Sequence, residues 1–483
     1  MAVRDDIEAG TWRELLSGAQ LGTSAVLAGG VGLHAVNVFL TTSLLPTAVG
    51  DIGGERLYAW STTVFMIASV ISAMLVSRVL ARRGPAGAYL VGLVPFVLGT
   101  LVCALSPSMP LLLAGRAVQG VGGGLLAGLG YAVVQGALPR HLWAKATALI
   151  SAMWGVGTLA GPAVGGLFAQ FGAWRWAFGL LAALGVVLAV VAPAVLPRAE
   201  RSGSGGGEPV PVASLLLLAL STALVSVAGL LGHPALVLGV LVSAAVLVVA
   251  FVAWERSATA RVLPASTYRP GTPLKWVYLT IAILTTGTAS EAFTPLFGQR
   301  LAGLEPFLAA FLGAAVSLGW SVSMVFSANA TRPRTLHRLR VAGPLQLALG
   351  LAVAGAFQRD GAGGLTVAVW FAALVAAGVG IGIAFPHLVV AAMRSSADPA
   401  EAGKAAAGAN TVELIALSFG SALGGVLVNL GAPDTSRSAQ YLLIGFALVA
   451  AAGCLTAGRT GGSSAAPEPA PVPELVGSAR PAA

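Results

Sequence analysis

Two glutamates stand inside long apolar runs of this sequence, Glu291 in "TASEAFTPLFGQ" and Glu413 in "GANTVELIALSFG". A carboxyl group among apolar residues holds its proton more tightly than one in water. Either glutamate could therefore bind and release a proton near neutral pH, which is the chemistry of proton-coupled exchange. The alternative for each is a structural role, with the side chain hydrogen-bonded between neighbouring helices.

Three further ionisable residues are candidates for the same chemistry: Arg116, His34 and Asp51. An arginine does not lose its proton in any useful pH range. We interpret Arg116 as a fixed positive charge that stabilises a carboxylate, and a structural arginine bonded to backbone carbonyls is an equally good interpretation. His34 could titrate near neutral pH or simply pack. Asp51 is expected at a helix end, where exposure is favoured over coupling.

The stretch "GVGTLAGPAVGGLFAQFGAW" combines glycines with an almost complete lack of charge. Gly157, Gly161 and Gly165 recur every four residues, with Pro162 and Gly166 beside them. On a helix this spacing places the three glycines on one face, where a neighbouring backbone can approach closely. We expect this face to act in gating, and static packing is the alternative.

The amino-acid composition indicates whether these residues lie in water or in a lipid bilayer. Hydrophobic residues make up 57% of the 483 positions and charged residues only 9%, against about 25% charged in soluble proteins. The sequence is therefore that of a membrane protein. A charged, amphipathic start argues against a cleavable signal peptide. Cys103 and Cys454 lie far apart, so neither a metal site nor a disulfide framework is expected.

Apolar segments long enough to cross a bilayer follow one another along the chain, about fourteen in all, in an order of six, two and six. The spans are expected near residues 24–49, 60–80, 86–105, 109–137, 144–170, 176–196, 212–231, 234–254, 275–297, 306–328, 341–357, 365–392, 404–430 and 438–457. No buried ionisable group is expected in the middle pair.

The predicted organisation follows from these spans. It comprises a cytoplasmic segment 1–23, a six-helix bundle 24–196, a Gly/Ser/Pro-rich linker 197–211, an inserted helix pair 212–254, a cytoplasmic connector 255–274, a second six-helix bundle 275–457 and a disordered tail 458–483.

Alternate loops differ in positive charge, and this asymmetry predicts the orientation. One set includes Arg82, Arg140, Arg261, Arg332 and Arg394, whereas the other holds only Arg56, Arg175, Arg300, Arg359 and Arg437. By the positive-inside rule, the rich set and both termini lie in the cytoplasm of a plasma-membrane protein. The formal charge of +9 is thus a topology signal. The positive residues form no continuous stripe, so no nucleic-acid partner is expected.

The two six-helix halves also resemble each other. "VQGVGGGLLAGLGYAVV" is similar to "AAGVGIGIAFPHLVVAA", and "GTLAGPAVGGLFAQFGA" is similar to "LSFGSALGGVLVNLGA". Chance likeness between Gly/Ala-rich helices is the alternative. Matching order and spacing favours repeats related by an axis along the membrane normal, as in transporters that rock around a midplane site.

Several motifs together resemble the major facilitator superfamily and its fourteen-helix drug:proton antiporters. "LLLAGRAVQGVGGG" resembles the fourth-helix motif, and "GTLAGPAVGG" resembles the fifth-helix motif of antiporters. "LLPTAVGDIGG", "YAWSTTVFMIAS" and "WRWAF" are similar to other family positions. The resemblance implies an all-α membrane protein with two six-helix bundles plus two inserted helices. It also implies that the glycine face packs against the helix near 306–328 and closes one side of a central cavity.

Two departures from the family pattern concern the expected mechanism. Ala81 stands where the family usually has an acidic residue after the second helix, which puts a latch at that loop in doubt. Asn37 stands where the family often has an aspartate in the first helix, so no proton-carrying role transfers there. Glu291 lies in the equivalent helix of the second half, and we prefer it over Glu413 as the coupling site.

The expected cavity has large apolar walls, which suit amphipathic organic molecules. Its candidate lining residues are Asn37, Trp60, Gln119, Trp154, Phe293, Trp320 and Asn410. We therefore predict a monomeric, proton-driven exporter of hydrophobic or amphipathic small molecules that needs no cofactor besides protons. A carrier for a specific metabolite and a receptor or scaffold without transport are the alternatives. No phosphate loop or catalytic constellation is present, so neither ATP-driven pumping nor an enzyme is expected.

Overall fold

The computed structural model describes residues 11–197, 210–330, 332–395 and 399–461, and every regular element within these ranges is a helix. The first part contains α1 (Trp12–Leu15), α2 (Gly18–Ile52), η1 (Glu55–Leu57), α3 (Tyr58–Ala73), α4 (Val76–Leu105), α5 (Met109–Ala132), α6 (Val134–Ala137), η2 (Arg140–Leu142), α7 (Trp143–Gln170) and α8 (Trp174–Val195). The remainder contains α9 (Val212–Ala228), α10 (Pro234–Ser257), η3 (Ala265–Tyr268), α11 (Leu274–Thr288), η4 (Ala289–Ala292), α12 (Thr294–Ala302), α13 (Pro306–Gly313), α14 (Ala315–Ser327), α15 (Pro333–Ala356), α16 (Gly364–Met393), α17 (Pro399–Gly431) and α18 (Thr435–Ala457).

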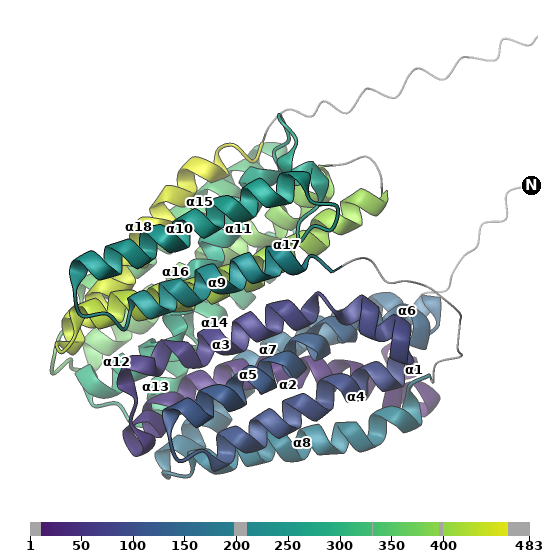
Figure 1. Cartoon of the computed structure of the whole chain (residues 1–483), viewed down its shortest axis with the longest axis horizontal. Helices are drawn as coiled ribbons and strands as arrows, with labels where there is room; N and C mark the ends of the chain where they lie inside the picture. Colours follow the sequence, from purple (N-terminus) through teal and green to yellow (C-terminus); the bar gives the residue numbers. More distant parts are fainter. Residues whose placement is uncertain (1–10, 198–209, 331, 396–398, 462–483) are drawn as a thin grey trace, which may run out of the picture.

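The long helices form two bundles that lie side by side, as Figure 1 shows in purple to blue and in green to yellow. The N-terminal half comprises α2–α8 and the C-terminal half comprises α11–α18. One end of the molecule carries the arginine-rich turns, among them the turn before α7, and we call it the basic end. The opposite end carries η1 and the turn between α12 and α13.

Ten helices are long and apolar enough to cross a membrane, or eleven if α13 and α14 count as one bent span, among the residues that the structure describes. The sequence predicts about fourteen. The difference arises because α3, α9 and α11 are short, with 16, 17 and 15 residues.

Two helices of the C-terminal half that the sequence predicts as continuous are broken. The predicted span 275–297 is divided into α11, η4 and α12, where Ser290 Oγ donates to Gly287 O (2.8 Å) and Pro295 begins α12. Proline is tolerated there because a first-turn residue needs no backbone N–H. The predicted span 306–328 bends by 44° between α13 and α14. Gly313, at the bend, packs against Pro295, so the two breaks meet.

Matching glycines make matching contacts in the two halves. A Cβ atom on Gly122 of α5 would lie 2.5 Å from Gly92 O of α4, and a Cβ atom on Gly380 of α16 would lie 2.5 Å from Gly343 O of α15. Such backbone approach excludes any larger residue. The similar glycine patterns of the two halves therefore correspond to the same packing, repeated.

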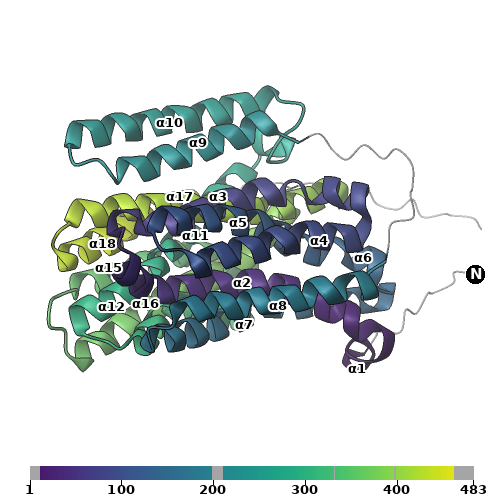
Figure 2. The ribbon, with the colours of Figure 1, turned by 60° about the horizontal axis from the view of Figure 1, so that its bottom comes forward.

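The inserted pair α9–α10 lies along the outside of the bundles, with α10 outermost (Figure 2). The apolar side of α9 meets both halves: Val225 packs with Val426 of α17, and Leu215 packs with Val70 of α3. The inserted pair thus covers the line where α3 and α17 come together.

The helix α10 extends past the predicted span 234–254, and a buried ionisable group lies in this extension. Glu255 at the end of α10 has no exposed surface. Its carboxylate accepts hydrogen bonds from Ser214 Oγ (2.5 Å), from the Val262 and Leu263 backbone N–H groups (3.1 and 3.2 Å) and from Tyr268 Oη (3.2 Å). Burial and the neighbouring Glu255 charge raise the pKa of Tyr268, which keeps its hydroxyl a donor. Four donors compensate the desolvation of this charge.

Candidate functional site

Arg116 is the centre of a buried polar cluster in the N-terminal half. Its Nη1 atom donates to Asn37 Oδ1 (3.2 Å), Thr41 Oγ1 (3.3 Å) and Gln119 Oε1 (2.5 Å), and its Nε atom donates to Ser61 O (3.2 Å). The side chain is only 1% exposed. Arg116, predicted as a fixed charge, is thus brought together with Asn37 and Gln119, which were predicted to line the cavity.

No carboxylate lies within ion-pair distance of Arg116 among the described residues. The guanidinium instead lies 4.1 Å from the centre of the Phe65 ring, a cation–π contact. Its Nη2 atom makes no hydrogen bond to a described residue. Arg116 is therefore a rigidly held positive charge with one nitrogen that has no hydrogen-bond partner among the described residues.

His34 lies beside this cluster without any hydrogen-bond partner for either ring nitrogen in the described chain. Its ring packs against Phe65 (5.5 Å between centroids) and edge-on against Trp154 (5.6 Å). A Cβ atom on Gly123 would lie 2.8 Å from Nδ1, so only glycine leaves room for the ring. His34 has the surroundings of an aromatic packing residue with two unused polar atoms.

Glu291 is buried in the C-terminal half, in η4, where α11 breaks. Its Oε1 atom accepts from the Ser317 backbone N–H (2.6 Å), and its Oε2 atom accepts from Ser317 Oγ (3.0 Å). Ser317 lies in the first turn of α14, directly after the 44° bend. The carboxylate thus caps the positive end of that helix, and it is held by one residue of a bent span.

Glu413 and Asn410 lie on α17 and are not part of either cluster. Glu413 is half-buried and makes no hydrogen bond or ion pair with the described residues, whereas Asn410 is exposed. The structure therefore separates the two candidate glutamates by their surroundings: Glu291 has two donors, and Glu413 has none.

The aromatic candidates differ in position. Trp60 and Trp154 are half-buried in the N-terminal half, and the Trp60 Nε1 atom is buried without a partner among the described residues. Trp320 is half-buried and packs with Phe385 (5.3 Å). Phe293 is only 1% exposed and packs with Tyr58 (5.4 Å), so it lies in the contact between the halves.

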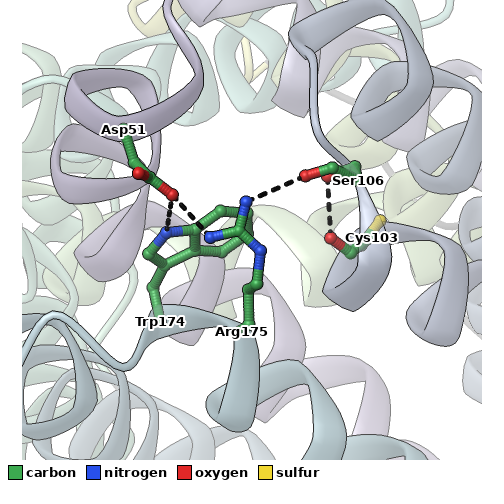
Figure 3. Close-up of polar contacts among 5 residues, drawn as sticks. All are labelled: Asp51, Cys103, Ser106, Trp174 and Arg175. Carbon is green, nitrogen blue, oxygen red and sulfur yellow. Dashed lines mark hydrogen bonds and ion pairs between the residues drawn. The ribbon is translucent and has the colours of Figure 1, made fainter.

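Asp51 lies at the end of α2 in an exposed network (Figure 3). Its Oδ2 atom accepts from Arg175 Nη1 (2.5 Å) and Trp174 Nε1 (3.2 Å), and Arg175 Nη2 donates to Ser106 O (3.2 Å). The network joins α2, the turn after α4 and the start of α8. Asp51 therefore has a structural role, because its hydrogen bonds help to hold three elements of the N-terminal half together.

The glycines of α7 mostly face the N-terminal half, and this corrects the expectation that they pack against the helix near 306–328. Cβ atoms on Gly157, Gly161 and Gly165 would lie 2.7 Å from Ala35 Cβ, 2.5 Å from Phe39 Cβ and 2.6 Å from Leu40 O, all on α2. The face of α7 that carries these three glycines therefore packs against α2.

Gly166 directly follows Gly165, so its side of the helix is rotated by about 100° from the glycine face. It faces the other half. A Cβ atom on Gly166 would lie 2.8 Å from Ala310 Cβ and 3.0 Å from Phe307 Cα of α13. Pro162 is buried within α7, which continues through it without a break.

The polar contacts between the halves that the structure describes gather near the end opposite the basic end. Arg300 pairs with Glu55 (2.5 Å), Gln170 Nε2 donates to Glu305 (3.0 Å), Tyr58 Oη donates to Ala292 O (3.0 Å), and Ser421 Oγ donates to Ala59 O (3.2 Å). The halves are thus joined at one end of the molecule.

A family model of the Major Facilitator Superfamily matches residues 27–421. The chain belongs to the Major Facilitator Superfamily. It is therefore a multi-pass membrane protein of a transporter superfamily and not of an enzyme family.

One relative of this superfamily member is a protein of Mycobacterium tuberculosis (strain ATCC 25618 / H37Rv) named probable multidrug-efflux transporter. The two are 49% identical over 454 residues, which cover 93% of this chain and 96% of that protein. The multidrug transporter protein MdtP of Bacillus subtilis (strain 168) is 21% identical over 415 residues, covering 84% and 75% of the two chains.

Solved structures share the major facilitator fold. The D-xylose-proton symporter superposes with a TM-score of 0.66 at 13% identity, covering 92% of this chain and all (100%) of that one. A bacterial homolog of the human lysosomal transporter Spinster, in an inward-facing and unoccupied conformation, gives a TM-score of 0.65 at 15% identity, covering 93% and 98%. These likenesses concern the fold alone.

Sequence reasoning missed Ser317, Glu255 and the Asp51–Arg175 pair. Ser317 is 26 residues from Glu291, and Arg175 is 124 residues from Asp51, so no local pattern joins them. Glu255 follows directly after an apolar run, a position that also suits an exposed interfacial residue. Its one distinguishing signal is the polar stretch after it, which supplies three of its four donor residues.

Proposed function

We propose that this protein is a proton-driven exporter of hydrophobic or amphipathic small molecules that works by alternating access. The observation that carries the proposal is Glu291, a buried carboxyl group held by a single residue at the bend of a span. The relative named probable multidrug-efflux transporter supports the class of substrate. Proton exchange at Glu291 would change its hold on α14, and so would couple protonation to helix position.

The two halves contribute different groups to this cycle. Arg116 supplies a fixed positive charge, while Asn37, Trp60 and His34 supply buried polar atoms that have no partner among the described residues. Arg116 and His34 lie against Phe65, and His34 also lies against Trp154. Polar atoms beside aromatic walls suit a ligand with a large apolar body and few polar groups. Gln119 and Trp320 complete the proposed cavity. Glu413, His34 and Asp51 are the alternative coupling sites.

The proposed topology has fourteen crossings. It adds α3, α9 and the α11–η4–α12 segment to the eleven spans counted with α13 and α14 as one. The bundles 24–196 and 275–457, the inserted pair 212–254 and the connector 255–274 keep their predicted bounds. Parts of the segment 1–23, the linker 197–211 and the tail 458–483 lie outside the described residues. The basic end faces the cytoplasm of a plasma-membrane monomer.

The coupling proposal is tested by flux in proteoliposomes that contain the full chain and an imposed pH gradient. Ethidium serves as the amphipathic probe. We expect gradient-driven ethidium accumulation with wild type, and Glu291→Gln should abolish the dependence on the gradient while leaving ethidium binding. Glu413→Gln is measured in parallel, and the exposed Glu14→Gln is the control for loss of a carboxylate.

Wild-type transport that ignores the pH gradient would contradict proton coupling altogether. Gradient dependence that survives in Glu291→Gln but not in Glu413→Gln would move the coupling site to α17. If both variants and the double variant keep it, His34 and Asp51 remain as candidates.

Orientation has its own test in a background with both native cysteines replaced by alanine. Cysteines at Thr259 and Gly363 lie at opposite ends of the molecule, and both positions are exposed. A membrane-impermeant maleimide should label Thr259→Cys only from the cytoplasm and Gly363→Cys only from outside intact cells. The reverse pattern would invert the proposed topology and the direction of export.

A further inference from the structure

A cavity of about 450 Å³ opens at the basic end of the C-terminal half, between the starts of α11 and α15 and the ends of α16 and α18. The residues that give it chemical character are Arg340, Arg394, His387, Ser395 and Thr460. It lies within one bundle, away from the Arg116 cluster and from Glu291. The proposed transport cycle makes no use of it.

The guanidinium of Arg340 is fixed in the cavity wall. Its Nε atom donates to Leu336 O (3.3 Å) and its Nη1 atom donates to Thr460 O (3.2 Å). The Nη2 atom makes no hydrogen bond with a described residue. Arg340 is therefore oriented by backbone carbonyls, with one donor group to spare.

Two other polar atoms in the wall are buried without a partner among the described residues: His387 Nε2 and Ser395 Oγ. The His387 side chain belongs to a residue that is only 8% exposed. Buried polar atoms are normally hydrogen-bonded, so this pair points to a ligand or to water. Arg394, at the end of α16, adds a second guanidinium at the exposed rim.

Within the part of the chain that the structure describes, the cavity is lined by positively charged side chains and by no carboxylate. No carboxylate in the described ranges forms an ion pair with Arg340 or Arg394, since the ion pairs found there involve other residues. Guanidinium groups match the geometry of phosphate oxygens and bind them through paired hydrogen bonds. The Ser395 hydroxyl adds a further donor for the same oxygens, and the His387 imidazole adds another when its Nε2 atom carries a hydrogen.

We propose that this cavity binds a phosphate-bearing anion, which is either the headgroup of an anionic lipid or a free phosphate. Both share the chemistry that the donors recognise. Basic pockets between helices at a membrane surface suit anionic headgroups, and the volume also admits a free anion. Because the cavity includes the ends of α16 and α18, an occupied site would hold these ends together.

The test uses the purified full chain in neutral detergent with three probes: dioctanoylphosphatidylglycerol, dioctanoylglycerol as its phosphate-free match, and inorganic phosphate. Binding and the thermal midpoint of unfolding are measured for each. We expect the phospholipid to bind and to raise the midpoint, while dioctanoylglycerol does neither. Competition by inorganic phosphate identifies a site for free anions, and binding of the phospholipid alone identifies a headgroup site.

Arg394→Gln is the main variant, since its exposed side chain carries little of the fold. It should weaken phosphatidylglycerol binding about tenfold, as expected for loss of a charge-assisted hydrogen bond. Arg340→Gln should weaken it at least as much. The exposed Arg334→Gln makes the same change in net charge outside the cavity and should have no effect.

Equal weakening by Arg334→Gln would show general surface attraction and overturn the proposal. Unchanged binding in Arg394→Gln and in Arg340→Gln would overturn it as well, and so would a lack of binding by both phosphate-bearing probes.

Discussion

The charge of the Glu291 carboxylate depends on two donors. A backbone N–H and a hydroxyl from the first turn of α14 donate to its oxygens and favour the ionised form over the protonated form. Ser317 supplies both donors, so under the proposed mechanism it is the positioning residue for proton exchange at Glu291. The balance depends on how close α14 stays to η4, and this is the link between a proton and a movement.

Ser317→Ala should move the pH of half-maximal gradient-driven transport to higher pH. The change removes one of the donors that favour the ionised carboxylate, and the carboxyl group then keeps its proton to a higher pH. A hydrogen bond that contributes about 1 kcal/mol corresponds to a change of about 0.7 pH unit. The measurement is the pH profile of ethidium transport in proteoliposomes.

Ser323→Ala is the matched control, because Ser323 Oγ donates to the Gly319 carbonyl within the same helix. Its profile should coincide with wild type. A Ser317→Ala profile that is unchanged, or that moves to lower pH, would argue against proton exchange at Glu291.

The sequence identifies Glu291 because a lone acid in an apolar run is conspicuous, but it cannot identify the partner. Ser317 becomes a neighbour only through the bend after Gly313, which no local pattern announces. The same limit applies to Arg116. Its charge is evident from the sequence, whereas its bonds to Asn37 and Ser61 depend on how α2 and α3 pack against α5.

At the scale of elements, α7 has two contact faces that differ by one residue. Gly161 approaches α2 within its own half, and Gly166 approaches α13 across the contact between the halves. The first contact stays within one bundle, whereas the second must open if the halves rock apart at this end. One glycine-rich sequence therefore makes one contact within its own half and another between the halves.

We expect leucine to have different effects at these two glycines. Gly161→Leu should overpack the N-terminal half, lower the free energy of unfolding by about 1–3 kcal/mol or more, and reduce the yield of folded protein. Gly166→Leu should leave yield and melting near normal but slow transport at least tenfold, because the halves cannot close around it. Detergent-solubilised yield, thermal melting and ethidium flux separate the two effects.

Normal flux in Gly166→Leu would mean that the α7–α13 contact is not needed in the cycle. A matching loss of folded protein in both variants would reduce Gly166 to a packing position like Gly161.

Hydrophobic length predicts most of the long helices, including α4, α8, α16 and α18. Hydrophobic length does not predict that α3, α9 and α11 are short, or that the spans near Glu291 and Gly313 are broken. The break at Glu291 and the bend after Gly313 depend on each other through Pro295, and this tertiary contact overrides an apolar pattern that reads as continuous. The spacing of the glycines predicts the glycine face of α7, but spacing alone cannot identify the neighbouring helix that this face contacts.

For the molecule as a whole, the contacts that join the halves at one end show which conformation of the transport cycle the structure represents. Under the proposed topology this end is extracellular, so the arrangement is closed to the outside. The Arg300–Glu55 pair is part of this closure, and both side chains are largely exposed. An exposed pair contributes at most about 1 kcal/mol, and a contact of this strength can be broken and remade in each cycle.

Arg300→Glu should favour opening at this end, because it places two negative charges together. A loss of up to about 1 kcal/mol corresponds to an increase of about fivefold in the open population. The reporter is Ser421→Cys in the cysteine-free background, since Ser421 is buried in the contact. Its rate of labelling by an impermeant maleimide should rise about fivefold and return when Glu55→Arg is added.

A double exchange that fails to restore slow labelling would show that the ion pair itself does not hold the halves together. Arg359→Glu, which changes an arginine of the same end outside the contact, should leave the rate unchanged.

Glu255 also has a consequence for the inserted helices. Its carboxylate ties α10 to residues 262–268, and Pro264 in that stretch lies against Gly408 of α17, so the hairpin is fastened to the C-terminal half. If the halves rock, the hairpin moves as a rigid body with the C-terminal half. Only its contact with α3 then has to change. A part that rides on one moving body adds almost the same energy to both states. Such a part therefore has little influence on the free-energy difference between the two states.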